Sequence, residues 1–123
     1  MLGYGVDITE ISRVRELISR RPAFVDRFFS REEQEYMQKI PERVAGNFCV
    51  KEAFSKAIGT GIRDFNLKDV EVLRDSLGKP YLRLSDALKA HCETLGYTRF
   101  QVSISHCREY AMAGVIAEQE ERR

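Results

Sequence analysis

Three charged side chains in two separate stretches of the chain have the types and spacing that phosphoryl-group chemistry needs. Asp7 lies in a mostly apolar run, Gly5-Val6-Asp7-Ile8, that is typical of a buried strand. Glu52 and Lys56 are four residues apart, which places them on one face of a helix. Two carboxylates can bind a hard cation such as Mg²⁺, and an ammonium group can neutralise charge on a phosphate. These residues therefore predict a site for a phosphate-bearing substrate.

Each of these side chains also has a purely structural interpretation. Strand alternation can place Asp7 on a solvent-exposed face, or Asp7 can help to cap the next helix. A Glu–Lys pair at this spacing stabilises a helix by roughly 0.2–0.5 kcal/mol without any further role. However, the helix that carries Glu52 and Lys56 is apolar around much of its circumference. Some of its charged side chains must therefore lie close to the protein core, where an unpaired charge raises the free energy of the folded state. This favours the functional interpretation.

Two further patterns could contribute to a phosphate site. Ser103-Ile104-Ser105-His106 ends a predicted strand, and its histidine can hydrogen-bond a phosphate or a ribose, although a histidine there is more often structural. Ser105 and His106 project to opposite faces unless the strand ends before His106. Gly59-Thr60-Gly61 is typical of a helix end, and its backbone amides could also border a phosphate. The sequence has no Walker loop, no nucleophile-elbow motif and no zinc-ligand spacing.

The composition limits which classes of protein the chain can belong to. Its 123 residues, 43% hydrophobic and 32% charged, suit a single packed domain over residues 1–123. A net charge of +1 gives no overall field that would favour nucleic acid. Three cysteines without a metal-binding spacing fit a reduced, cytoplasmic protein, and no segment approaches the roughly 20 apolar residues of a membrane span. A chain this short has little concave surface, so we suspect an active site shared between subunits.

The hydrophobic periodicity predicts the elements that must position these residues. The predicted strands span residues 2–8, 70–74, 81–84, 99–105 and 111–117. The predicted helices run from an N-cap at Thr9 to Pro22, and over residues 31–39, 42–58 and 86–95. Ser30 and Glu33 are expected to form a capping box. The hairpin-like connectors favour antiparallel pairing, so the predicted fold class is α+β, with a small antiparallel sheet packed against helices.

The order and spacing of these motifs resemble the small, bacterial-type holo-(acyl-carrier-protein) synthases, a family of 4′-phosphopantetheinyl transferases. The resemblance rests on Gly5-Val6-Asp7-Ile8, Lys51-Glu52-Ala53-Phe54-Ser55-Lys56-Ala57-Ile58-Gly59-Thr60-Gly61, Gly78-Lys79-Pro80 and Ser103-Ile104-Ser105-His106. The match extends from residue 3 to about residue 117, and the block that ends in Gly-Thr-Gly is its most specific part. The resemblance implies the 4′-phosphopantetheinyl transferase fold, in a homotrimer with active sites at the subunit interfaces.

The resemblance also implies a reaction. Such an enzyme transfers the 4′-phosphopantetheine group from coenzyme A to a serine of apo acyl carrier protein and releases adenosine 3′,5′-bisphosphate. The reaction depends on Mg²⁺ and supports fatty acid biosynthesis. Asp7 and Glu52 match the family's metal ligands, and Glu52, directly or through a water on the metal, helps to deprotonate the serine. Lys56 matches a lysine that contacts the phosphates, so the expected catalytic residues are Asp7, Glu52 and Lys56.

Further residues match binding positions of the family. The expected coenzyme A contacts are Lys56, Gly59, Thr60, Gly61, Lys79, Pro80, Ser105 and His106. In the trimer, His106 would serve the site whose Asp7 and Glu52 come from a neighbouring subunit. Family members dock an acidic carrier protein on the helix after the first strand. The expected docking residues are Arg13, Leu17, Arg20, Arg21, Phe24 and Arg27. By itself, this arginine-rich segment is also typical of a solvated helix face with mixed ion pairs.

The sequence departs from the family pattern in two places, at Asn47 and in the short connector from Lys39 to Val44. Many relatives have Ala-Gly-Arg-Phe where this chain has Ala45-Gly46-Asn47-Phe48, so a phosphate or coenzyme A contact is expected to be lost or moved. Lys39 and Arg43, in the short connector before this run, are candidate basic contacts. Two other functions stay open. One is a Mg²⁺-dependent nucleotide pyrophosphohydrolase that uses water as acceptor, and the other is a non-catalytic binder of an acidic protein.

Overall fold

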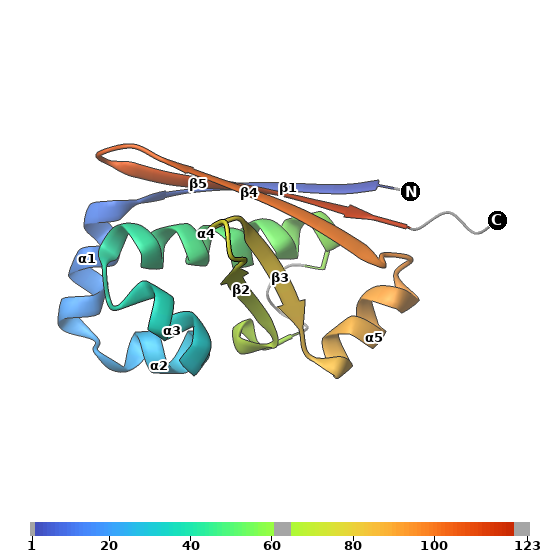
Figure 1. The fold of residues 1–123 in the computed structure, drawn as a ribbon, viewed down its shortest axis with the longest axis horizontal. Coiled ribbons are helices and arrows are strands. Elements are labelled where there is room, and N and C mark those ends of the chain that lie inside the picture. Colours follow the sequence, from blue (N-terminus) through green and yellow to red (C-terminus); the bar gives the residue numbers. More distant parts are fainter. Residues whose placement is uncertain (1, 61–64, 120–123) are drawn as a thin grey trace.

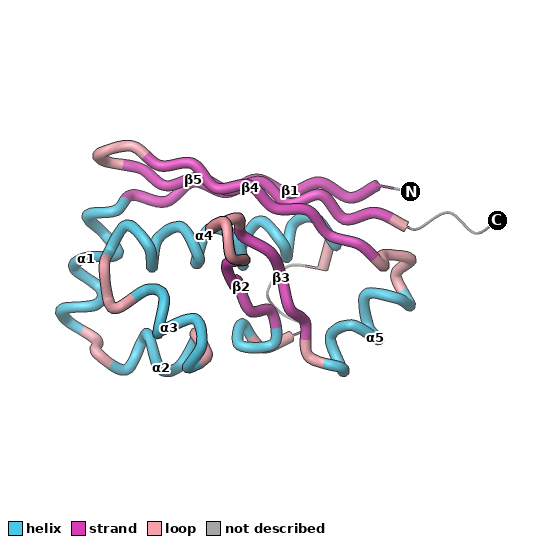
Figure 2. The backbone as a smooth tube through the Cα atoms, in the orientation of Figure 1, coloured by secondary structure: helices cyan, strands magenta, loops and turns pink. Residues whose placement is uncertain are grey.

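A three-stranded antiparallel sheet covers one side of a long helix, α4 (Pro41–Ile58), and the other helices and a hairpin lie on the same side of the sheet as α4 (Figures 1 and 2). The computed structural model describes residues 2–60 and 65–119. The sheet has the order β1–β5–β4 and contains β1 (Leu2–Glu10), β4 (Arg99–His106) and β5 (Tyr110–Glu118). The hairpin contains the antiparallel strands β2 (Val70–Arg74) and β3 (Pro80–Leu84). The predicted α+β class with antiparallel pairing is confirmed.

The shorter helices lie toward the two ends of α4 (Figure 1). Helices α1 (Ile11–Arg20), α2 (Ala23–Phe28) and α3 (Arg31–Met37) precede α4, and α5 (Asp86–Thr94) joins β3 to β4. A single 3-10 turn, Leu67–Asp69, precedes β2. The predicted capping box of α3 is confirmed, because Glu33 N donates to Ser30 Oγ at 3.3 Å and Ser30 N donates to Glu33 Oε1 at 3.1 Å. Within the described residues, no helix is long and apolar enough to cross a membrane.

The structure differs from the sequence analysis at two places in the first third of the chain. Thr9 is not the N-cap of α1, because β1 continues to Glu10 and Thr9 pairs with Ala111 of β5. The pairing with β5 therefore overrides the local capping preference of threonine. The sequence also gave no sign of α2. Pro22 ends α1, but its backbone is itself helical (φ −57°, ψ −28°) and leads directly into α2.

Two glycines let β1 lie directly against α4. A Cβ atom at Gly3 would overlap the carbonyl oxygen of Ala57, and one at Gly5 would overlap that of Ala53. Both overlaps involve helix backbone, which cannot move aside as a flexible side chain can. The Gly-x-Gly spacing thus fixes the distance between β1 and α4, and with it the position of Asp7 over the helix that carries Glu52 and Lys56.

A buried ion pair, which the sequence analysis did not identify, joins α4 to its neighbours. Lys51 Nζ lies 2.8 Å from Glu33 Oε1 of α3, and both side chains are 0% exposed. The same ammonium donates to the carbonyl oxygens of Phe28 (3.0 Å) and Leu67 (2.7 Å). Burial raises the pKa of Glu33 and lowers the pKa of Lys51. Lys51 therefore links α4 to α2, α3 and the turn before β2.

Candidate active site

Asp7 lies on the inner face of β1, over α4. It pairs in register with Ala113 of β5, which is buried, and its own side chain is 17% exposed. Lys56 Nζ is 3.3 Å from Asp7 Oδ1 and donates to the Val6 carbonyl oxygen at 3.1 Å. The solvent-facing and helix-capping interpretations of Asp7 therefore do not apply. The structure brings the predicted carboxylate of β1 to the predicted lysine of α4.

Glu52 lies close enough to Asp7 for the two carboxylates to repel. Burial and then the charge of Asp7 raise the pKa of Glu52, and the charge of Lys56 partly opposes this. Among the residues that the structure describes, no three His, Cys, Asp or Glu side chains converge on one point. A pair of hard carboxylates fits Mg²⁺, which takes one or two protein carboxylates and completes its shell with water and phosphate oxygens. A bound cation would also relieve the repulsion between Asp7 and Glu52.

A short hydrogen-bond chain holds the other oxygen of Asp7. Thr9 Oγ1 donates to Asp7 Oδ2 at 3.4 Å, and Cys49 Sγ in α4 donates to Thr9 Oγ1 at 3.0 Å. Burial raises the pKa of the Cys49 thiol to about 12, so the thiol keeps the proton that it donates. Hydrogen bonds of this kind, made to a carboxylate by residues that do not touch the metal, orient a carboxylate that binds a metal. Sequence reasoning missed this chain, although Thr9 shares a strand face with Asp7.

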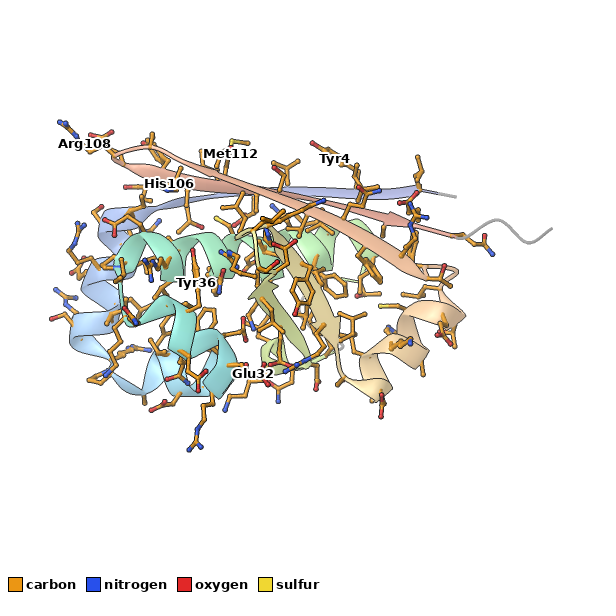
Figure 3. All side chains as sticks on the ribbon, viewed as in Figure 1. Tyr4, Glu32, Tyr36, His106, Arg108 and Met112 are labelled. Carbon is orange, nitrogen blue, oxygen red and sulfur yellow. The ribbon has the colours of Figure 1, made fainter. Side chains whose placement is uncertain are left out.

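His106 does not reach Asp7 within one chain. Strand β4 continues through His106, which pairs with Ala111, and Asp7 lies on the strand at the opposite edge of β5. Figure 3 shows His106 near the end of the sheet that carries the Arg108 turn. Because the strand does not end before His106, Ser105 and His106 project to opposite faces. Ser105 pairs with the exposed Met112 on the outer face.

Besides Lys56 beside Asp7 and Ser105 and His106 on β4, the predicted coenzyme A contacts occupy two further places on the chain. Gly59 ends α4 with φ +82°, as the glycine signal predicted, and Thr60 follows it, whereas Gly61 lies outside the described residues. Lys79 and Pro80 lie at the hairpin between β2 and β3.

The hairpin lies beside the first half of α4, because Arg74, the register partner of Pro80, donates to Asn47. Asn47 and Gly59 are separated by roughly 18 Å along the helix, at 1.5 Å per residue. One chain therefore does not bring the two groups of residues together.

The predicted docking residues lie on α1, α2 and the turn between them. Arg13, Leu17 and Phe24 line one cavity of about 360 Å³, together with Thr9 and Phe48. This cavity connects the arginine-rich face to the strand that carries Asp7.

The arginines of this face differ in their partners. Arg20 pairs with Glu16 at 2.8 Å, and the guanidinium of Arg27 stacks over the Phe28 ring at 5.4 Å. Within the described part of the chain, Arg13, Arg21 and Arg27 have no carboxylate within 4.0 Å. The mixed-ion-pair interpretation thus accounts for Arg20 but leaves these three charges uncompensated.

Comparison with known proteins assigns the chain to a family. The model of the 4′-phosphopantetheinyl transferase superfamily matches residues 3–114. A holo-[acyl-carrier-protein] synthase of Clostridium botulinum (strain Eklund 17B / Type B) is 47% identical over 119 residues, which cover 94% of this chain and 96% of that protein.

Two solved structures are also similar to the chain. The crystal structure of the Helicobacter pylori holo-[acyl-carrier-protein] synthase in complex with coenzyme A has a TM-score of 0.87 at 28% identity, over 94% of this chain and 99% of that one. The Bacillus anthracis synthase in complex with CoA (3′,5′-ADP) has a TM-score of 0.79 at 34% identity, over 96% of each chain. The fold and the paired carboxylates agree with the family match, which covers nearly the whole chain. The chain therefore belongs to the 4′-phosphopantetheinyl transferase superfamily.

Proposed function

We propose that the chain transfers the 4′-phosphopantetheine group of coenzyme A to a serine of an apo acyl carrier protein, with Mg²⁺ bound by Asp7 and Glu52, in support of fatty acid biosynthesis. The observation that carries the proposal is the convergence of Asp7, Glu52 and Lys56 in a member of the phosphopantetheinyl transferase superfamily. The relatives' names support the reaction, since they are holo-[acyl-carrier-protein] synthases and two were solved with coenzyme A or its 3′,5′-ADP part. All three cysteines are free thiols, which supports a cytoplasmic location.

The reaction requires little covalent chemistry from the protein. The carrier serine oxygen attacks the phosphorus nearer the pantetheine, a new P–O bond forms, and the P–O bond to adenosine 3′,5′-bisphosphate breaks. The serine gives up its proton, and Glu52, directly or through a water, is the group that would accept it. Lys56 offers positive charge beside Asp7 for the phosphates. When bound, Mg²⁺ supplies charge neutralisation on the pyrophosphate.

We also propose that three copies of the chain assemble through the outer face of the sheet. That face exposes Leu2 (72%), Tyr4 (68%), Ile8 (63%), Met112 (44%) and Ile116 (40%). Figure 3 shows Tyr4 and Met112 pointing away from the helices. A contiguous apolar surface of this kind marks a protein interface. His106 does not reach Asp7 within one chain, so we propose that it serves the site of a neighbouring subunit.

The arginine face of α1 and α2 is the surface that we propose for the carrier protein. Arg13, Arg21 and Arg27 supply uncompensated positive charge for an acidic partner, and Leu17 and Phe24 in the adjoining cavity supply apolar contacts. The cavity also contains Thr9 and thus leads toward Asp7. A carrier docked here would have its serine close to the catalytic carboxylates.

The release of adenosine 3′,5′-bisphosphate tests this function against its rivals. The protein is incubated with coenzyme A and Mg²⁺, with or without an apo acyl carrier protein, and the nucleotide products are separated chromatographically. We expect release only with the apo carrier, and none with a carrier whose acceptor serine is replaced by alanine. Release without any carrier would indicate a pyrophosphohydrolase. Carrier binding without release would indicate a binding protein.

A further inference from the structure

Two guanidinium groups meet at one aromatic ring beside the first half of α4. The guanidinium carbon of Arg74 lies 4.1 Å from the ring centroid of Tyr36, and that of Arg43 lies 5.0 Å from the same centroid. Arg43 Nη1 also donates to the Tyr36 carbonyl oxygen at 2.7 Å. Figure 3 shows Tyr36 beside the part of α4 nearest its N-terminus. Two like charges from α4 and β2 thus share one tyrosine of α3.

The two guanidinium groups of this cluster have no direct ion-pair partner among the described residues. In the part of the chain that the structure describes, neither Arg43 nor Arg74 has a carboxylate within 4.0 Å. The carboxylate of Glu33 is already engaged by Lys51 Nζ (2.8 Å) and by Val72 N, which donates at 3.1 Å. Burial lowers the pKa of Arg74 and the charge of Arg43 acts in the same direction, whereas Tyr36 and the charge of Glu33 raise it. An anion between the two arginines would relieve their repulsion.

Arg74 also has an unsatisfied donor. Its Nη1 atom is buried and has no hydrogen-bond partner among the described residues. Leaving a buried donor without an acceptor is costly, and such groups in a native structure call for an explanation such as a missing ligand. Arg43 is exposed, so its side chain can move aside and open access to this atom without disturbing the core. Arg74 therefore keeps one N–H donor that an anion could accept from.

Asn47 holds Arg74 in this position. Asn47 is 0% exposed, its Oδ1 accepts from Arg74 Nη2 at 3.0 Å, and its Nδ2 donates to the Val72 carbonyl oxygen at 3.5 Å. Position 47 is the one at which the family pattern has an arginine on the helix. In this chain a neutral side chain occupies that position and fixes a guanidinium from the adjacent strand beside it.

We infer that Arg74, positioned by Asn47, binds a phosphate group of coenzyme A together with Arg43. The inference rests on the proposed function and names residues of the same substrate site. Positions 47 and 52 are about 140° apart around α4, at 100° per residue, so the cluster cannot share a phosphate with Asp7 and Glu52 of its own chain. It serves the site whose carboxylates come from a neighbouring subunit. The bound group is either the 3′-phosphate or the pyrophosphate of coenzyme A.

Steady-state kinetics with coenzyme A and with dephospho-coenzyme A, which lacks the 3′-phosphate, test the inference. Arg74→Gln and Arg43→Gln are compared with the unmodified chain and with Arg83→Gln, which removes an exposed arginine that already pairs with Glu71 and Glu32. We expect the KM for coenzyme A to rise roughly ten- to hundredfold for Arg74→Gln and less for Arg43→Gln, because a charge-assisted hydrogen bond is lost. The kcat should change less than the KM, and Arg83→Gln should stay within about twofold.

The two substrates identify the phosphate group. A KM that rises for coenzyme A but not for dephospho-coenzyme A assigns the cluster to the 3′-phosphate, and a rise for both assigns it to the pyrophosphate. A KM within about twofold of the unmodified chain for both substrates, in variants with an unchanged thermal midpoint, overturns the inference. If Arg74→Gln does not fold, Arg43→Gln decides alone, since its side chain lies at the surface. Absence of transfer by the unmodified chain would instead refute the proposed function.

Discussion

Lys51 and Lys56, two lysines of one helix, show how the position of a side chain separates a structural role from a catalytic one. Lys51 is 0% exposed and its ammonium is engaged by Glu33 and two carbonyl oxygens. Lys56 is 54% exposed on its side chain and lies beside Asp7 at the edge of α4. The first ammonium is satisfied entirely by the protein, whereas the second remains accessible to a phosphate. Only Lys56 is therefore assigned to the site.

Replacing Glu52 tests the role of the second carboxylate. Glu52→Gln keeps the size of the side chain but removes the charge that we propose binds Mg²⁺ and takes part in removing the serine proton. We expect kcat to fall by at least about a hundredfold, the lower range for loss of an acid–base group. Intact-mass rate measurements on the carrier give kcat, and size-exclusion chromatography checks that the assembly is unchanged. Glu93→Gln on α5 is the matched control, and near-normal turnover by a folded Glu52→Gln protein would refute the assignment.

At the scale of elements, the contact between β1 and α4 determines where Asp7 lies. Gly5→Ala would place a Cβ atom into the carbonyl oxygen of Ala53, so we expect the strand to shift and the free energy of unfolding to fall by about 1–3 kcal/mol. Mg²⁺ affinity should weaken with it, because Asp7 moves relative to Glu52. Urea unfolding and calorimetric Mg²⁺ titration measure the two effects.

Gly46→Ala, on α4, is the control for Gly5→Ala. Its Cβ would meet only a terminal methyl of Ile104, at 3.3 Å, and alanine favours the helix by about 1 kcal/mol. We expect it to be nearly neutral in stability. Equal losses for Gly5→Ala and Gly46→Ala would contradict the account of the close approach.

The buried ion pair provides a second test at this scale. Lys51→Met leaves Glu33 buried and unpaired, so we expect a loss of about 3–5 kcal/mol in the free energy of unfolding. Adding Glu33→Gln should recover part of the loss, because it removes the uncompensated charge. Urea unfolding at a fixed protein concentration measures both variants, with the exposed Lys89→Met as control. A double variant that loses the sum of both single effects would show that the two residues do not act as a pair.

Local sequence signals predicted most of the elements, and long-range contacts account for what they missed. The capping box at Ser30 and the glycine end of α4 depend on neighbouring residues, so both could be identified in advance. The N-cap assigned to Thr9 was wrong because β5, a hundred residues later, extends β1. The contacts Thr9–Cys49 and Asn47–Arg74 were missed for the same reason, since they join residues distant in sequence.

The catalytic residues were easier to predict than the binding residues. Helical spacing placed Glu52 and Lys56 on one face of a helix, strand alternation left the side of Asp7 open, and the structure brings Asp7 and Lys56 within 3.3 Å. The expected coenzyme A contacts near Gly59 and those near Lys79 are distributed along one chain, so local spacing could not relate them. Their relation depends on an assembly that one sequence does not describe.

At the scale of the whole molecule, the charge of α1 and α2 should govern carrier binding. Reversal of Arg13 and Arg21 to glutamate replaces attraction by repulsion toward an acidic partner. We expect the KM for the carrier to rise by about tenfold or more, and the KM for coenzyme A to stay within about twofold. Lys89→Glu on α5 is the control for a general change of charge. Equal increases in both KM values would argue against a docking surface here.

The outer face of the sheet should govern assembly. Ile116→Glu places a charge on the exposed apolar face, so we expect the molar mass in light scattering to fall from that of three chains to that of one. Transfer should fall with it, because the proposed site takes residues from two subunits. Leu77→Glu is a matched control, since Leu77 is 93% exposed but lies in the hairpin turn. A single-chain mass for the unmodified protein with full activity would contradict the shared site.

The most direct test of the central claim is the intact mass of an apo acyl carrier protein after incubation with this protein, coenzyme A and Mg²⁺. We expect the carrier to gain the mass of one phosphopantetheine group. The gain should disappear with EDTA and with a carrier whose acceptor serine is replaced by alanine. No mass gain on several apo carriers, with the protein shown to be folded and assembled, would contradict the proposed transfer.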